Sequence, residues 1–343
     1  MIDYQTNKQN KKNTLPTWAS IILLLLFSIP TILALLIPVV GPRDESILEN
    51  RTLQQFPTFT LLSFKDGSFQ DDLEDALIDQ LPLMEPIKET VLDGKNELLK
   101  LQQEILYAAN PDLRSQYSLI ADGYYHFAGD DHRIVEKPGD YTDYKDHLEE
   151  LAANLSKLSG VKRYVYFVEN SRSVSFENPD HENRIYNEVV AAIQPEASDL
   201  FKVPDYQTYC EYFYQTDHHW NYKGSYEAYK EIHRLLHGTD HGVIEPRETI
   251  TTDVIFQGSY ARQTHDLCAN EAFTFQTFDL PNYSTQINGR RRAYGNETAY
   301  EKGKYSKEPL ANHYANCFGG DFGEIIYDFG STGRGRLLII ASS

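Results

Sequence analysis

The sequence predicts an α/β protein with a mostly parallel sheet and covering helices, preceded by one N-terminal transmembrane helix. Expected strands and helices alternate from residue 140 to residue 237, a pattern typical of parallel sheets. Near the end of the chain, residues 337–341 have the apolar composition of a central parallel strand. The transmembrane helix is predicted from residues 18–40, a run of 23 residues without a charged side chain. At about 1.5 Å per residue, this run reaches roughly across the hydrocarbon core of a bilayer.

The charges on either side of this run predict its orientation. Three lysines precede it, Lys8, Lys11 and Lys12. Acidic residues follow it, beginning with Asp44 and Glu45. This asymmetry places the N-terminus in the cytoplasm and the globular part outside, as a single-pass protein of the cell membrane. The alternative is a cleaved signal peptide, but the apolar run is long for one and no A-x-A-like site follows.

We therefore divide the chain into four parts by residue number. The expected parts are a cytoplasmic tail (1–17), a transmembrane anchor (18–40), a linker with membrane-proximal helices (41–110) and a globular domain (111–343).

The spacing of apolar residues predicts each element in turn. In the linker, Phe69, Leu73 and Leu77 recur at helical spacing, so a helix is expected over 67–81, ended by Pro82. A second helix is expected over 85–107 and a hairpin over 117–127. In the alternating region we expect helices over 140–158, 182–193 and 222–237 and strands over 161–168 and 199–203. Short strands and loops are expected over 250–330.

Composition excludes several kinds of site. A net charge of −18 argues against nucleic acid as a partner. Three cysteines are too few and too scattered for a disulfide framework, and at most one bridge can form. His233, His237 and His241 follow at four-residue intervals, but Gly238 would end the helix between them. We therefore predict no metal site and no cofactor.

The densest chemical feature is the segment 216–221, which contains Asp217 and His219. Residues two apart on an extended segment point to the same side. The Asp217 carboxylate can then accept the N–H of His219 and leave the other ring nitrogen as a base. The alternative is a hydrogen-bonded pair with no catalytic task.

Residues 214–224, YQTDHHWNYKG, resemble the signature of the DHHW family, which is related to the SGNH domains of alginate O-acetylation proteins. Other segments that are similar to this family occur in the expected order: 49–53 with Pro57, 69–82, 256–260, 314–320 and 337–343. The resemblance implies an SGNH-like, flavodoxin-like sheet.

By position, the resemblance also implies catalytic roles. Asp217 would orient the imidazole, His219 would be the general base, and Ser343, after the last strand, would be the nucleophile. Ser342 replaces Ser343 if the strand slips by one residue. Because the sequence stops at Ser343, we expect a domain truncated at this strand and impaired in catalysis, since no following N–H can bind the oxyanion.

Four further residues are candidates for substrate binding. Trp220 would stack on a sugar or pack as a buried structural side chain. Gly258 would leave room for the oxyanion or serve as a turn glycine. Tyr260 is a candidate binding residue, and Arg262 a candidate substrate contact.

The expected function is that of an exported, membrane-anchored esterase or O-acetyltransferase acting on cell-surface polysaccharide. One alternative is a non-catalytic cell-surface protein that binds polysaccharide. Another is a scaffold that partners a multi-span membrane acyltransferase.

Overall fold

The computed structural model describes residues 41–81, 84–139, 144–178, 183–332 and 335–341, together with Ser28. The described residues divide into two compact units. The first unit takes those of Met1–Ser46 and Arg51–Glu89, and the second takes those of Ile47–Asn50 and Thr90–Ser343.

An ion pair joins a strand to a helix in the first unit. It contains the antiparallel strands β1 (Glu45–Ser46) and β2 (Arg51–Thr52), the helices α2 (Leu61–Asp66) and α3 (Ser68–Gln80), and the start of α4 (Met84–Ala109). The Arg51 guanidinium donates two hydrogen bonds, of 2.8 and 2.7 Å, to the Asp79 carboxylate at the end of α3. These bonds hold the pKa of Asp79 at about 2, against the effect of its burial. Two of the segments that carry the family resemblance, 49–53 and 69–82, therefore contact each other.

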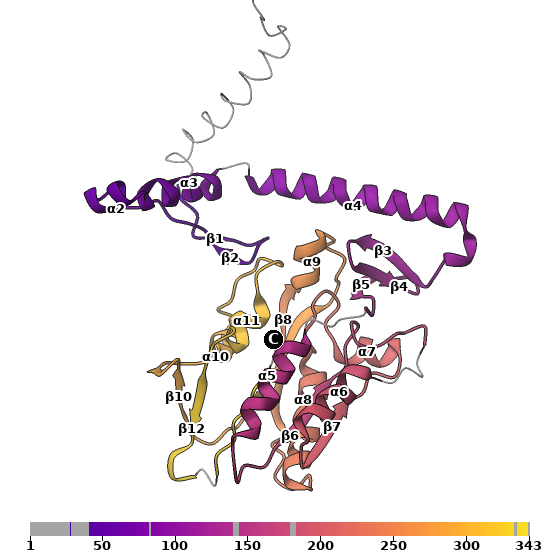
Figure 1. The fold of residues 1–343 in the computed structure, drawn as a ribbon, viewed down its shortest axis with the longest axis vertical. Helices are drawn as coiled ribbons and strands as arrows, with labels where there is room; N and C mark the ends of the chain where they lie inside the picture. The colour runs from indigo at the N-terminus through magenta and orange to yellow at the C-terminus, as the bar shows by residue number, and fades with distance from the viewer. Residues whose placement is uncertain are drawn as a thin grey trace, which may run out of the picture. The chain divides into compact units, whose positions relative to one another are not determined.

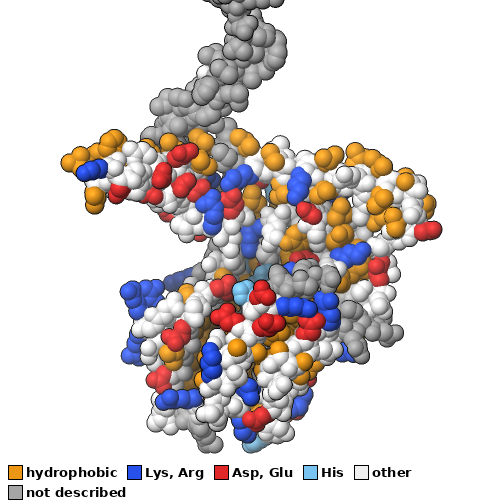
Figure 2. All heavy atoms as spheres, in the orientation of Figure 1, with side chains coloured by type: hydrophobic (Ala, Val, Ile, Leu, Met, Phe, Trp, Pro, Cys, Tyr) orange, Lys and Arg blue, Asp and Glu red, His pale blue; other side chains and the backbone are white. Residues whose placement is uncertain are grey.

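Helix α4 exposes a row of apolar side chains, visible along it in Figure 2. Exposed members of this row are Val91, Leu98, Leu101 and Ile105. They recur at helical spacing, and the helix includes the range 85–107 that the sequence predicts.

The second unit contains four small sheets (Figure 1). Strands β3 (Tyr117–Ala121), β4 (Tyr124–Phe127) and β5 (Asp130–Glu136) form an antiparallel meander. Strands β8 (Pro246–Ile255) and β9 (Ala272–Phe278) form an antiparallel ladder. Strand β10 (Ser284–Ile287) lies between β11 (Arg290–Arg291) and β12 (Ile325–Asp328). Among the described strands, only β6 (Tyr164–Val168) and β7 (Ala197–Phe201) pair in parallel.

Helices complete the second unit. They are α5 (Tyr144–Ser156), α6 (Arg184–Ile193), α7 (Tyr206–Tyr212), α8 (Tyr222–His237), α9 (Ser259–Thr264), α10 (Glu297–Glu301) and α11 (His313–Phe318). Two 3₁₀ turns, η1 (Pro111–Leu113) and η2 (Gly330–Thr332), lie outside these helices. Helix α8 packs against β6 and β7, and α5 packs against α6. The Asn221 side chain caps α8, and Gly238 ends it with a φ of 70°.

The prediction of a mostly parallel, SGNH-like sheet is wrong. Helices and strands are found where they were expected between residues 117 and 237, but among the described strands only one pair is parallel. Residues 337–341 form no strand, and the side chains of Leu337 and Leu338 are 62% and 76% exposed. Their composition is that of a buried strand, but no strand in the described part of the chain pairs with them.

None of the described helices is long and apolar enough to cross a bilayer. Apart from Ser28, the expected transmembrane segment 18–40 lies outside the described residues.

Two aromatic clusters make up most of the core of the second unit. The first consists of Tyr117, Phe127, Val135, Val174, Phe201, Val203, Tyr209, Phe213 and Ala228. The second consists of Tyr214, Phe256, Phe273, Phe275, Tyr300 and Cys317. Phe213 and Tyr214 are neighbours in sequence but belong to different clusters. Their backbone therefore runs between the two clusters, directly before the Asp-His-His segment.

The second cluster should be sensitive to the loss of a buried ring. Phe273 is fully buried, so Phe273→Ala should lower the free energy of unfolding of the full chain by about 3–5 kcal/mol. Phe322 is 43% exposed, so Phe322→Ala should cost less than about 1 kcal/mol. Chemical denaturation measures both values, and equal losses would contradict this account of the core.

Candidate functional site

The Asp-His-His segment is a closed turn between α7 and α8. An isolated antiparallel bridge joins Phe213 to Trp220. Within it, the N–H of Tyr214 donates to the carbonyl of His219 at 3.2 Å. The N–H of Asn221 donates to the carbonyl of Tyr212 at 2.8 Å, directly before α8 begins. These bonds bring residues 215–218 to the tip of the turn.

Strand β5 holds the first half of this turn. The buried guanidinium of Arg133 donates to the carbonyls of Phe213 and Tyr214, both at 2.9 Å. The N–H of Ile134 donates to the carbonyl of Gln215 at 2.8 Å. Because these donors come from a strand about 80 residues earlier, the turn is fixed by tertiary structure.

Residues 270 and 271 hold the same turn from another side. The side-chain oxygen of Gln215 accepts the N–H groups of Asn270 and Glu271 at 2.8 and 3.1 Å. The N–H of Gln215 donates to the Glu271 carboxyl group. Burial raises the pKa of Glu271 to about 7, against the effects of this hydrogen bond and of the Arg133 charge.

Asp217 is the buried centre of the site, and its side chain is 2% exposed. One carboxylate oxygen, Oδ1, accepts the backbone N–H of His219 at 3.0 Å and the ring nitrogen Nδ1 of His219 at 2.5 Å. The other oxygen, Oδ2, accepts the N–H of Ser259 at 2.7 Å. Burial opposes the charge, but the hydrogen bond and charge of His219, with that of His218 and the Ser259 N–H, hold the pKa of Asp217 at about 2.

Gly258 lies directly against Asp217. A methyl group on Gly258 would lie 2.4 Å from Asp217 Cβ and 2.5 Å from Asp217 Oδ2. The Gly258 N–H donates to Thr216 Oγ1 at 2.9 Å, so this donor is already engaged. Glycine is required here by the close approach of two backbone segments, and its N–H is not directed at an oxyanion.

The geometry assigns the tautomer of His219. Asp217 is ionised at neutral pH and can only accept hydrogen bonds, so Nδ1 of His219 carries the proton. In the neutral ring, Nε2 then has a lone pair. Nε2 has no hydrogen-bond partner among the residues that the structure describes, and the side chain is 33% exposed. The ring stacks on Tyr314 of α11, with centroids 3.9 Å apart and planes 12° apart.

His218 and Ser259 extend this arrangement. Nδ1 of His218 lies 2.9 Å from Ser259 Oγ, at hydrogen-bonding distance, and its ring lies against that of His219 with centroids 3.8 Å apart. Partial desolvation lowers the pKa of His218, against the attraction of the Asp217 carboxylate. Ser259 therefore contacts the site twice, through its N–H to Asp217 and through its hydroxyl to His218.

The structure places the other expected site residues less favourably for substrate contact. Tyr260 is 3% exposed, and its hydroxyl donates to Glu136 at 2.7 Å. Arg262 is buried and donates to the carbonyl of Leu310 at 3.2 Å, and burial lowers the pKa of its guanidinium. Trp220 packs against the first aromatic cluster, with its ring 6.1 Å from that of Phe201.

The predicted contact between Asp217 and His219 is present, but the predicted nucleophile is not among the residues that the structure describes. Ser343 and the alternative Ser342 lie outside the described residues. Ser259 and Tyr314 were not predicted as site residues, because neither lies near residue 217 along the chain. A signal was nevertheless present, since both belong to segments that carry the family resemblance, 256–260 and 314–320.

A metal ion fits this site poorly, although Asp217, His218 and His219 form a group of potential ligands. Both carboxylate oxygens of Asp217 already accept N–H groups, and Nδ1 of His218 is bound to Ser259. A cation would have to displace these bonds. The arrangement is that of an oriented base.

Comparison with protein-family models, curated proteins and solved structures finds no match for this chain.

Gly258→Ala should damage the site through a steric clash. The added methyl group would push Asp217 away from its donors, so we expect a loss of about 1–3 kcal/mol in the free energy of unfolding. Gly320→Ala is the matched control, because a methyl group there meets no atom within 4 Å. Denaturation of the full chain measures both, and a Gly258→Ala protein as stable as the control would contradict the contact.

Glu271 should make stability depend on pH. Its pKa is about 7 in the folded protein and near 4.5 in the unfolded chain, so the folded state binds more protons between these values. Stability should therefore fall as pH rises from 4.5 to 7, by up to about 3 kcal/mol from this group. The difference between wild type and Glu271→Gln, measured by denaturation across this range, isolates the effect. A difference that does not change with pH would contradict it.

Proposed function

We propose that this chain carries a general-base site for acyl transfer or ester hydrolysis, with Asp217 as the orienting carboxylate and His219 as the base. One observation carries this proposal. A buried carboxylate fixes the proton on Nδ1 of His219 and leaves Nε2 on a ring that is 33% exposed. A general base needs this combination of a fixed tautomer and an accessible, unprotonated ring nitrogen.

The chemistry follows from the tautomer. Nε2 of His219 removes the proton from a hydroxyl group, and the hydroxyl oxygen attacks the carbonyl carbon of an ester. When the ester bond breaks, the leaving alkoxide takes the proton from His219. The acyl group then passes to water or to a sugar hydroxyl. Asp217 stabilises the imidazolium that forms in between.

The hydroxyl group that attacks has two possible sources in this chain. The family resemblance supports Ser343, or Ser342 after a slip of one residue. Ser259 is the serine that the structure places in the site, but its hydroxyl bonds to His218 and not to His219. Ser259 is therefore better suited to positioning Asp217 and His218 than to attacking an ester.

The proposed substrate is cell-surface polysaccharide, and its support is the family resemblance alone. The same holds for a membrane acyltransferase as partner. A location outside the cytoplasm remains a prediction from the charges that flank residues 18–40. The alternative of a non-catalytic polysaccharide-binding protein is less well supported, because the ring of Tyr260 is buried and its hydroxyl is bound to Glu136.

Variants of the two central residues test the proposal. His219→Gln removes the base, and Asp217→Asn removes the acceptor that fixes the tautomer, so each should lower kcat for hydrolysis of an acetyl ester by about 10²- to 10⁴-fold. Proton NMR of the full chain should also show the Nδ1–H of His219 as a low-field signal that disappears in both variants. This second measurement does not require activity.

His237→Gln is the matched control, because His237 lies in the last turn of α8 and contacts His233, away from Asp217. It should leave both the rate and the low-field signal unchanged. Ser343→Ala, Ser342→Ala and Ser259→Ala identify the attacking hydroxyl by which of them abolishes hydrolysis. Hydrolysis that proceeds at the wild-type rate in both Asp217→Asn and His219→Gln would overturn the proposal.

A further inference from the structure

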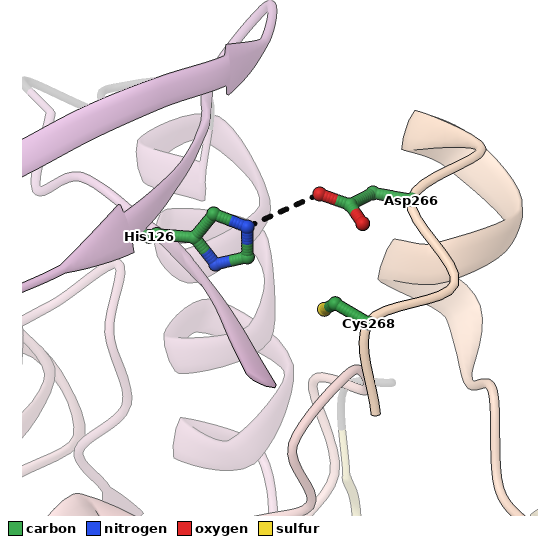
Figure 3. A group of neighbouring side chains, drawn as sticks. All are labelled: His126, Asp266 and Cys268. Atoms are coloured by element: carbon green, nitrogen blue, oxygen red, sulfur yellow. Dashed lines mark hydrogen bonds and ion pairs between the residues drawn. The ribbon is translucent and has the colours of Figure 1, made fainter. Parts of the chain in front are cut away.

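A second group of chemically reactive side chains lies apart from the Asp-His-His turn. It consists of His126 on β4 and of Asp266 and Cys268 on the segment that follows α9 (Figure 3). One ligand atom from each residue lies within 4.8 Å of the other two. All three side chains are partly buried. Figure 3 shows the imidazole of His126 facing the two other side chains across a short gap.

The hydrogen bonds of His126 place a positive charge beside the Asp266 carboxylate. Nδ1 of His126 lies 2.8 Å from the carbonyl oxygen of Arg133, which can only accept, so Nδ1 carries a proton. Nε2 lies 3.1 Å from Oδ2 of Asp266, and an ionised carboxylate also only accepts. A neutral imidazole has one N–H and cannot satisfy both. Either the ring carries a second proton or a cation lies between Nε2 and the carboxylate.

We propose that His126, Asp266 and Cys268 bind one zinc ion, through Nε2, a carboxylate oxygen and Sγ. Imidazole, carboxylate and thiolate are the three ligand types that zinc uses in proteins. A thiolate ligand would disfavour magnesium and calcium, which prefer oxygen ligands. Two anionic ligands also balance the charge of a divalent ion. The fourth tetrahedral position would be filled by water.

One hydrogen bond of His126 is of the kind that orients a metal-binding histidine, and two others hold the segment of Asp266 and Cys268. A metal-bound histidine usually donates its other N–H to a carbonyl or carboxylate, as Nδ1 of His126 does to Arg133. The N–H of Asp266 donates to Thr264 Oγ1 at 3.2 Å. The carbonyl of Cys268 accepts from Nδ1 of His132 at 2.9 Å. The segment that carries two of the ligands is thus fixed before a metal binds.

Cobalt and zinc binding to the full chain test the proposal. One equivalent of Co²⁺ should produce the near-ultraviolet charge-transfer band of a cobalt–thiolate bond and the strong visible absorption of a tetrahedral site. Zn²⁺ should displace Co²⁺ and remove both bands. Cys268→Ser should abolish the charge-transfer band, and His126→Gln should weaken zinc binding more than about 100-fold in competition with a chromophoric chelator.

Cys210→Ser is the matched control, because Cys210 is also an unpaired, partly buried cysteine. It should keep both bands and the zinc affinity of the wild type, and circular dichroism should show all variants folded. A charge-transfer band that survives in Cys268→Ser, or a wild-type chain that binds no Co²⁺ or Zn²⁺, would overturn the proposal. If the wild-type chain binds neither metal, the group is a His126–Asp266 ion pair beside a thiol. None of these measurements depends on the activity of the Asp217–His219 site.

Discussion

The buried carboxylate of Asp217 is the constraint on which the arrangement of the site depends. An ionised carboxylate away from water costs several kcal/mol unless hydrogen bonds replace its hydration. Its three N–H donors come from two residues, His219 and Ser259, that are far apart in the chain. The segment of Ser259 can approach only because residue 258 has no side chain. The turn, the glycine and the start of α9 therefore form one unit, and the tautomer of His219 follows from it.

Local features of this chain could be predicted from sequence because their causes are local. Helix α8 was expected over 222–237 and is found there, since Asn221 caps it and Gly238 ends it. The contact between Asp217 and His219 was expected from their spacing and is present, although the segment is a bent turn and not the extended segment expected. The hairpin of β3 and β4 follows from the alternating pattern around Asp122-Gly123. For the helix and the hairpin, the residues that determine the feature are its neighbours in sequence.

The pairing of strands and the partners of the site could not be predicted in this way. Alternating strands and helices favour a parallel sheet, but they do not determine which strands pair, and here most pairs are antiparallel. The apolar run at 337–341 shows the same limit, since composition specifies that a segment suits a sheet interior but not that a neighbour exists. His126 lies 140 residues from Asp266, a spacing that matches no metal-binding motif. Such groups are visible only after the chain has folded.

One short segment connects the base site to the proposed zinc site. It begins at Gly258 and Ser259, which contact Asp217, passes through the buried helix α9, and ends at Asp266 and Cys268. A ligand that binds only the folded form of a segment stabilises that form by mass action. Zinc at the far end would therefore favour the conformation in which Ser259 reaches Asp217, without touching the reacting groups. In the proposed arrangement the zinc ion would support the orientation of the base, and the proposed chemistry would belong to the imidazole of His219.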